Sequence, residues 1–148
     1  MEKHLFLFSP GKWLGEGKIH LNMVEEELLF FTRWKIEEKE EKGCIVCTQE
    51  IQIKGLSDIM INQFSFFDIT SSGFSLDMEN YAVGKISGKG FIQEKRIGWE
   101  FRVQETGFEG FEFYDKQTDE LYFMHGEFST PDDLRTKIKG KIWRQNQL

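Results

Sequence analysis

The chain has 148 residues, a formal net charge of −6, and a composition that is 39% hydrophobic and 15% aromatic. This length suits a single domain over residues 1–148, and so aromatic a chain can bury enough apolar surface to exclude whole-chain disorder. Two cysteines exclude a disulfide-stapled scaffold. No apolar run approaches the roughly 20 residues that a membrane-spanning helix needs.

The acidic charge balance excludes further classes of partner. An excess of 25 acidic over 19 basic residues argues against nucleic-acid binding and against docking on an anionic membrane surface. The apolar stretch 5–8 is too short for the core of a signal peptide, and no small-residue cleavage site follows it. We therefore expect a cytoplasmic protein whose partners include neither nucleic acid nor a membrane.

In chain order, short apolar or alternating runs follow one another, and each ends at a turn signal. They predict strands over residues 13–21, 28–36, 44–53, 59–69, 74–79, 83–92, 97–103, 108–114, 121–128 and 135–144. A spacing of roughly 8–14 residues without a long crossover predicts an all-β fold. We expect a single up-and-down antiparallel β-barrel of about ten strands.

Two segments carry helix signals. Residues 24–42 are rich in Glu, Leu and Lys, and Gly43 would suit the end of a helix, but Leu28 to Ile36 alternate in the manner of a strand. Residues 129–134 combine capping residues with Pro131 and two acids, which predicts at most one short helical turn.

The period of two in a strand predicts which side chains share a face. On the last strand the lysines must face solvent, so Ile138, Gly140 and Ile142 point inward. On strand 97–103, Trp99 and Phe101 share one face, and Glu100 and Arg102 share the other. The simpler alternative turns the aromatic face toward the core, and the other turns the polar face toward a cavity.

The first strand carries the motif Gly11-Lys12-Trp13-Leu14-Gly15-Glu16-Gly17. It resembles the Gly-x-Trp opening of lipocalins and related calycins, and its extended form looks like the nitrobindin and fatty-acid-binding-protein-like branch. The resemblance implies a barrel that is closed at one end by Gly11 and Trp13. It also implies a cation–π contact on Trp13 from Arg144 or Arg135. Such barrels commonly hold small apolar ligands, pigments or haem.

Haem and metal are not expected here. Nitrobindin-like haem proteins supply a histidine near the C-terminal end, whereas the last strand of this chain has none. Cys44 and Cys47 form a lone pair without the further ligands of a zinc site, so we expect them to pack in the fold. We therefore expect no cofactor.

Aromatic residues and a few polar groups on adjacent strands are the candidate ligand site. The candidates are Trp34, Phe64, Phe66, Trp99, Arg102, Glu112, Tyr114 and His125. The aromatic side chains would bury an apolar body, and the polar ones would orient it or satisfy one another. No constellation of catalytic residues is recognisable, so an enzymatic role stays open and is not favoured.

These patterns predict non-covalent binding of a small hydrophobic molecule, such as a fatty acid or a pigment, inside the barrel. One alternative is a structural or interaction barrel with a filled interior, including a homodimer. The second is an enzyme or lyase that acts on a bound lipid or pigment. An open cavity would favour ligand binding, and a packed interior would favour the filled barrel.

Overall fold

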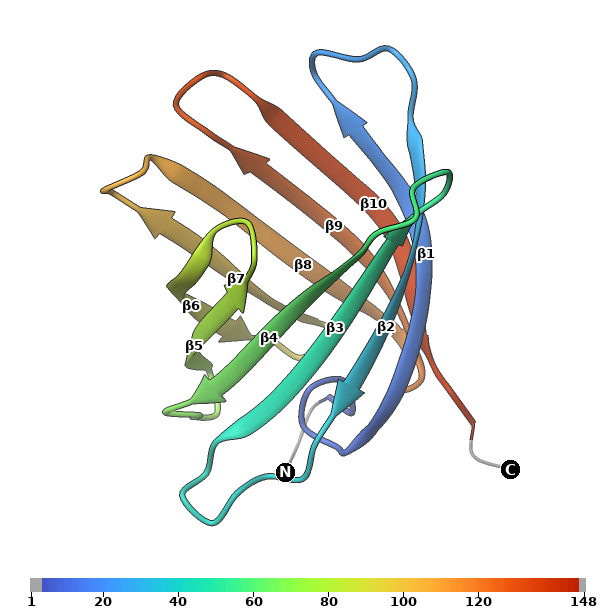
Figure 1. Ribbon diagram of the computed structural model, residues 1–148. Coiled ribbons are helices and arrows are strands. Elements are labelled where there is room, and N and C mark those ends of the chain that lie inside the picture. Colours follow the sequence, from blue (N-terminus) through green and yellow to red (C-terminus); the bar gives the residue numbers. More distant parts are fainter. Residues whose placement is uncertain (1–3, 147–148) are drawn as a thin grey trace.

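The computed structural model describes residues 4–146, which form a closed antiparallel barrel of ten strands (Figure 1). Each strand pairs with its neighbours along the chain, and β1 also pairs with β10 to close the sheet. The strands are β1 (Gly11–Leu21), β2 (Leu28–Ile36), β3 (Ile45–Ile53), β4 (Ile59–Phe67), β5 (Gly73–Asn80), β6 (Gly84–Ile92), β7 (Arg96–Val103), β8 (Phe108–Thr118), β9 (Leu121–Ser129) and β10 (Arg135–Arg144). This architecture confirms the predicted fold class.

The two segments with helix signals form strands and turns in the structure. β2 covers the expected range Leu28–Ile36, because alternating burial of one face outweighs the helix propensity of its flanks. In segment 129–134 the amide of Asp133 donates to the carbonyl of Thr130 over 3.1 Å, which makes a single turn between β9 and β10. Among the predicted strand ranges, the one for β8 differs most from the structure: the strand was expected to end at residue 114 and continues to Thr118.

Burial settles which face of each strand points inward. The lysines of β10 face solvent and Ile142 is fully buried, as predicted. On β7 the aromatic face lies inside, since Trp99 is fully buried and Arg102 is exposed. On β8 the inward face carries Glu112 and Tyr114. The aromatic residues of β7 and the polar residues of β8 therefore line the same interior.

Glycines bend the sheet where β1 meets β10. Gly17 and Gly140 are directly opposite in the β1–β10 register. A Cβ atom on Gly17 would lie 2.1 Å from the main-chain oxygen of Lys139, and one on Gly140 would lie 2.4 Å from that of Glu16. Only glycine permits so close an approach of two strands, so this pair shapes a corner of the barrel.

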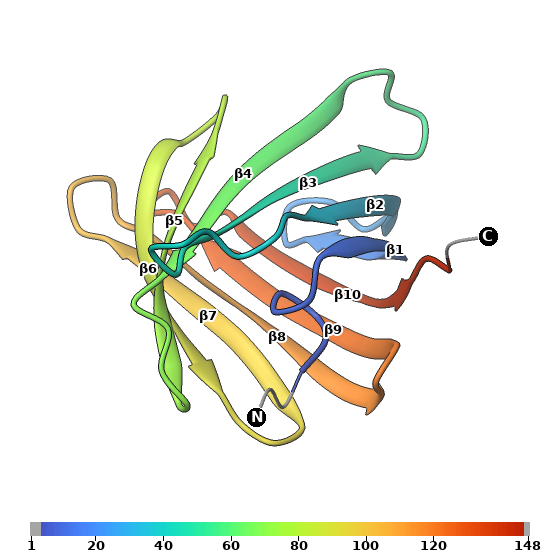
Figure 2. The ribbon, with the colours of Figure 1, turned by 90° about the horizontal axis from the view of Figure 1, so that it is seen from below.

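The N-terminal segment, residues 4–10, closes the lower end of the barrel (Figure 2). Phe6 is fully buried, and its ring centroid lies 5.3 Å from that of Trp13 and 5.7 Å from that of Tyr122. The Nε2 atom of His4 donates to the carbonyl of Gln93 over 2.6 Å, and Nδ1 lies 2.6 Å from the hydroxyl of Tyr122. The sequence did not predict this plug.

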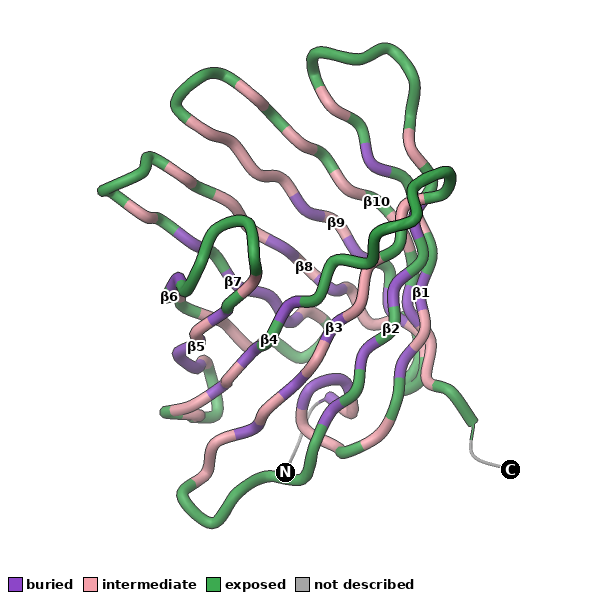
Figure 3. The backbone as a smooth tube through the Cα atoms, in the orientation of Figure 1, coloured by how far each residue is buried: buried purple, intermediate pink, exposed green. Residues whose placement is uncertain are grey.

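The upper end of the barrel differs from the lower end. In Figure 3 the N-terminal segment at the lower end is largely buried, whereas the loops of the upper rim are exposed. Inward apolar residues near that rim are only partly buried: Leu21, Leu28, Ile51, Ile53, Val103, Phe108, Phe128 and Ile138. The interior is thus filled below and reached by solvent from above. Among residues 4–146 no helix has the length and hydropathy of a membrane span.

Candidate functional site

An aromatic cluster fills the lower interior of the barrel. Trp34 lies at its centre, with its ring centroid 5.2 Å from Phe64 and 6.2 Å from Trp99. Trp99 in turn lies 5.3 Å from Tyr114 and 5.8 Å from Phe66. These five candidates come from β2, β4, β7 and β8 and meet only because the sheet closes on itself.

Glu112 lies on β8 beside this cluster and is only 7% exposed. Gly126 of β9 is directly opposite, and a Cβ atom there would lie 3.2 Å from Cγ of Glu112, so the glycine leaves room for the carboxyl group. In the described part of the chain no cation pairs with Glu112. Burial raises the pKa of this carboxyl to about 7. The nearby indole of Trp99, which does not reach hydrogen-bond geometry, lowers the pKa by a smaller amount.

Three buried donors in the same region lack an acceptor within residues 4–146. They are the Nε1 atoms of Trp34 and Trp99 and the hydroxyl of Tyr114. Burial, reinforced by Glu112, raises the pKa of Tyr114 well above its ordinary value, so the phenol keeps its proton. An unsatisfied buried polar group destabilises a fold by about 1–3 kcal/mol. A ligand acceptor that reached these donors would remove that penalty.

A chain of side-chain hydrogen bonds crosses the opposite wall from β5 to β2. Asn80 donates to Oδ1 of Asn62 over 2.9 Å, and Asn62 donates to Oε1 of Gln49 over 3.0 Å. Gln49 donates to the hydroxyl of Thr32 over 3.1 Å, and Thr32 donates to the carbonyl of Glu50 over 3.0 Å. This chain satisfies its own members and therefore does not call for a ligand.

This amide chain was not predicted from the sequence, although a signal for it is present there. Thr32 stands between Phe30 and Trp34 in the alternating phase that the structure turns inward. Gln49 stands in the same way between Cys47 and Ile51. A polar residue in the buried phase of a strand predicts a buried hydrogen-bond network.

A chain of known structure shares this barrel. The S-type phycobiliprotein lyase CPES from Guillardia theta superposes with a TM-score of 0.69 at 12% sequence identity. The match covers 95% of the present chain and 90% of the lyase chain. The fold is calycin-like. No protein-family model and no curated protein matches the sequence.

Two ligand-site candidates lie away from the calycin-like interior. Arg102 is exposed on the outer face of β7. His125 also points outward, with Nε2 3.9 Å from Glu127 and its ring 5.9 Å from that of Phe111. The structure therefore brings together six of the eight candidates and separates these two from them.

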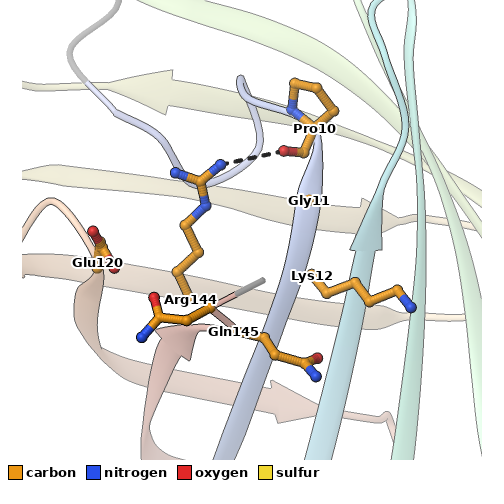
Figure 4. A pocket seen from close by; sticks show the side chains of 7 residues that line it. Pro10, Gly11, Lys12, Glu120, Arg144 and Gln145 are labelled. Carbon is orange, nitrogen blue, oxygen red and sulfur yellow. Dashed lines mark hydrogen bonds between the residues drawn. The ribbon is translucent and has the colours of Figure 1, made fainter. Parts of the chain in front are cut away.

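Two of the predicted closing residues, Gly11 and Arg144, lie together at the lower end of the barrel (Figure 4). Trp13 is fully buried and is directly opposite Arg144 in the β1–β10 register. The Nη2 atom of Arg144 lies beside Gly11 and 3.5 Å from the carbonyl of Pro10. Within the described residues the cation–π contacts are those of Arg96 and Lys141, so the expected contact between Arg144 and Trp13 is replaced by one to the main chain.

The cysteines show no reactive or metal-binding arrangement. Cys47 is fully buried in β3, and burial raises the pKa of its thiol. Cys44 is partly buried just before the strand, and its pKa is also raised by burial and by Glu40. Residues 4–146 contain no cluster of three or more His, Cys, Asp or Glu side chains that could hold a metal ion.

Proposed function

We propose that the barrel binds a small organic molecule with an apolar body and a polar end that carries an N–H beside a carbonyl. The observation that carries the proposal is the set of three unpaired donors in the aromatic cluster that lies beside the buried carboxyl of Glu112. A ligand carbonyl would accept hydrogen bonds from Trp34, Trp99 or Tyr114. Its N–H would donate to the carboxylate of Glu112, and an amide or lactam supplies both groups.

The partly buried apolar ring at the upper end would take the body of the ligand. Ile51, Phe108 and Phe128 belong to this ring, and the N-terminal plug closes the other end, so the ligand enters from above. Burying a side-chain-sized apolar group contributes about 1.5–3 kcal/mol, so several such groups reach micromolar affinity without an ion pair.

A linear tetrapyrrole pigment is the first ligand to test. Its conjugated body is flat and largely apolar, and its two end rings are lactams. The name of the structural neighbour, a phycobiliprotein lyase, points to the same class of compound. A fatty acid has the apolar body but no N–H for Glu112, and haem has no lactam.

The rival function is a filled barrel that serves structure or protein contact alone. It is favoured by the full burial of Trp34, Trp99 and Tyr114, whose donors lie beneath the aromatic packing. Ligand binding at these donors requires the cluster to open by a rotation of one or more rings. Binding measurements separate the two functions.

The test is titration with biliverdin, followed by quenching of tryptophan fluorescence and by circular dichroism of the pigment band. We expect saturable binding that Glu112→Gln and Tyr114→Phe each weaken about tenfold, the loss of one hydrogen bond in a dry site. Glu109→Gln, on the outer face of the same strand, should leave the affinity unchanged. Haem should bind more weakly and without dependence on Glu112. No saturable biliverdin signal would overturn the proposal in favour of the filled barrel.

A further inference from the structure

The outer wall of the barrel carries a groove that is separate from the interior site. It has a volume of about 560 Å³ and crosses β2, β1, β10 and β9. Its two banks are apolar: Leu29 and Phe31 of β2 are 41% and 51% exposed, and Phe123 of β9 is 50% exposed. Between them, the lining from β1 and β10 carries Lys18, Lys139 and Lys141 together with Glu16. We call this feature the lysine groove.

The floor of the lysine groove holds an unfavourable charge arrangement. Lys18 and Lys139 are directly opposite each other in the β1–β10 register, and like charges in that position destabilise a sheet. Glu27 lies 4.0 Å from Lys18. Lys141 is paired with Glu16, 3.8 Å away, so the three lysines of the lining outnumber its two glutamates and Lys139 is the lysine left without an acidic partner among the described residues. An anionic group placed between the two lysines would relieve their repulsion.

The spacing of the banks specifies the shape of the partner. Adjacent strands lie about 4.8 Å apart, so the three steps from β2 to β9 span about 14 Å. An extended peptide rises about 3.3 Å per residue, so its first and fifth residues lie about 13 Å apart. Its first, third and fifth side chains share one face. An apolar–x–acidic–x–apolar segment that crosses the strands would thus place its acidic residue over the lysines.

We propose that the lysine groove docks an extended segment of a partner protein with this alternating apolar, acidic, apolar pattern. The carboxylate pairs with Lys18 and Lys139, and the two apolar side chains pack on Phe31 and Phe123. Contact through one charge and two side chains makes the interaction weak and sensitive to salt. The groove lies on the outer face, so this inference is independent of the ligand in the interior.

The first experiment is a titration of the ¹⁵N-labelled protein with the peptide Ac-Phe-Ser-Glu-Ser-Phe-NH2, read by amide chemical shifts. We expect saturable shifts at Lys18, Phe31, Phe123 and Lys139. The matched peptide with Gln in place of Glu should bind at least fivefold more weakly. Equal binding of the two peptides, or shifts confined to the upper rim, would overturn the proposal.

The second experiment uses a double variant, Lys18→Gln with Lys139→Gln, and the control Lys95→Gln in the distant β6–β7 turn. The double variant should lose at least fivefold in peptide affinity. Its free energy of unfolding should change little, because removal of the repulsive pair offsets the loss of the exposed contact between Lys18 and Glu27, so lost binding cannot be attributed to unfolding. Biliverdin titration should be unchanged in both variants.

One result would overturn the role of the two lysines in binding, and another would overturn a partner protein as the occupant of the groove. An equal loss of peptide affinity in Lys95→Gln would show a general charge effect rather than a docking site. A concentration-dependent dimer that Phe123→Ala abolishes would assign the groove to a second copy of this chain. Loss of biliverdin binding alone would count against the interior site and leave the lysine groove standing.

Discussion

Glu112 makes the stability of the barrel depend on pH. The pKa of this buried carboxyl rises from 4.5 to about 7, so the folded protein binds a proton that the unfolded chain has released. The contribution of Glu112 is therefore most favourable below pH 4.5. It declines as the pH rises to 7 and stays low above that. Relative to low pH, Glu112 lowers the free energy of unfolding by about 1 kcal/mol at pH 5, where only the unfolded chain has ionised, and by about 3 kcal/mol at pH 8, where the buried carboxylate is ionised too.

The substitution Glu112→Gln removes this titration with little change of shape. We expect the variant to exceed the natural protein in free energy of unfolding by about 3 kcal/mol at pH 8 and by about 1 kcal/mol at pH 5. Urea unfolding of both proteins at each pH measures the difference, because other titrating groups are common to both. Glu109→Gln, exposed on the same strand, should follow the natural protein at every pH. Parallel stability profiles for Glu112→Gln and the natural protein would refute the burial argument.

Three further substitutions test the packing. Trp13→Ala should lower the free energy of unfolding by about 3–5 kcal/mol in urea, since the ring is fully buried against the plug; an unchanged midpoint would remove Trp13 from the barrel floor. Gly17→Ala should cost about 1–3 kcal/mol in the same assay, because the new methyl group meets a main-chain oxygen of β10. Gly55→Ala is the matched control. A Cβ atom there would have no neighbour within 4 Å, so any cost should come from the left-handed backbone conformation alone. Asn62→Ala removes two hydrogen bonds of the amide chain and should lower the free energy of unfolding by about 1–3 kcal/mol. Gln63→Ala, on the exposed face, should leave the free energy of unfolding nearly unchanged.

Local patterns predicted the strands because their signals lie within a few residues of one another. The alternation in Leu28–Ile36 marks β2, and the lysines of Arg135–Arg144 mark the solvent face of β10. The same patterns singled out Trp34, Trp99 and Glu112 as site candidates, since an excess of aromatic residues and polar side chains on adjacent strands are visible in the sequence. That these side chains lie together in one interior could not be predicted from local patterns, because they belong to strands that are distant along the chain.

The sequence by itself determined the fold class and which side chains share a face of each strand. Tertiary structure decided which face of β7, β8 and β9 points inward, because a period of two is the same whichever side of the sheet is concave. It also decided that residues 4–10 fill the floor and that β2, β1, β10 and β9 form a groove. These features depend on the pairing of β1 with β10, which brings the first and last strands together through contacts that no local pattern encodes.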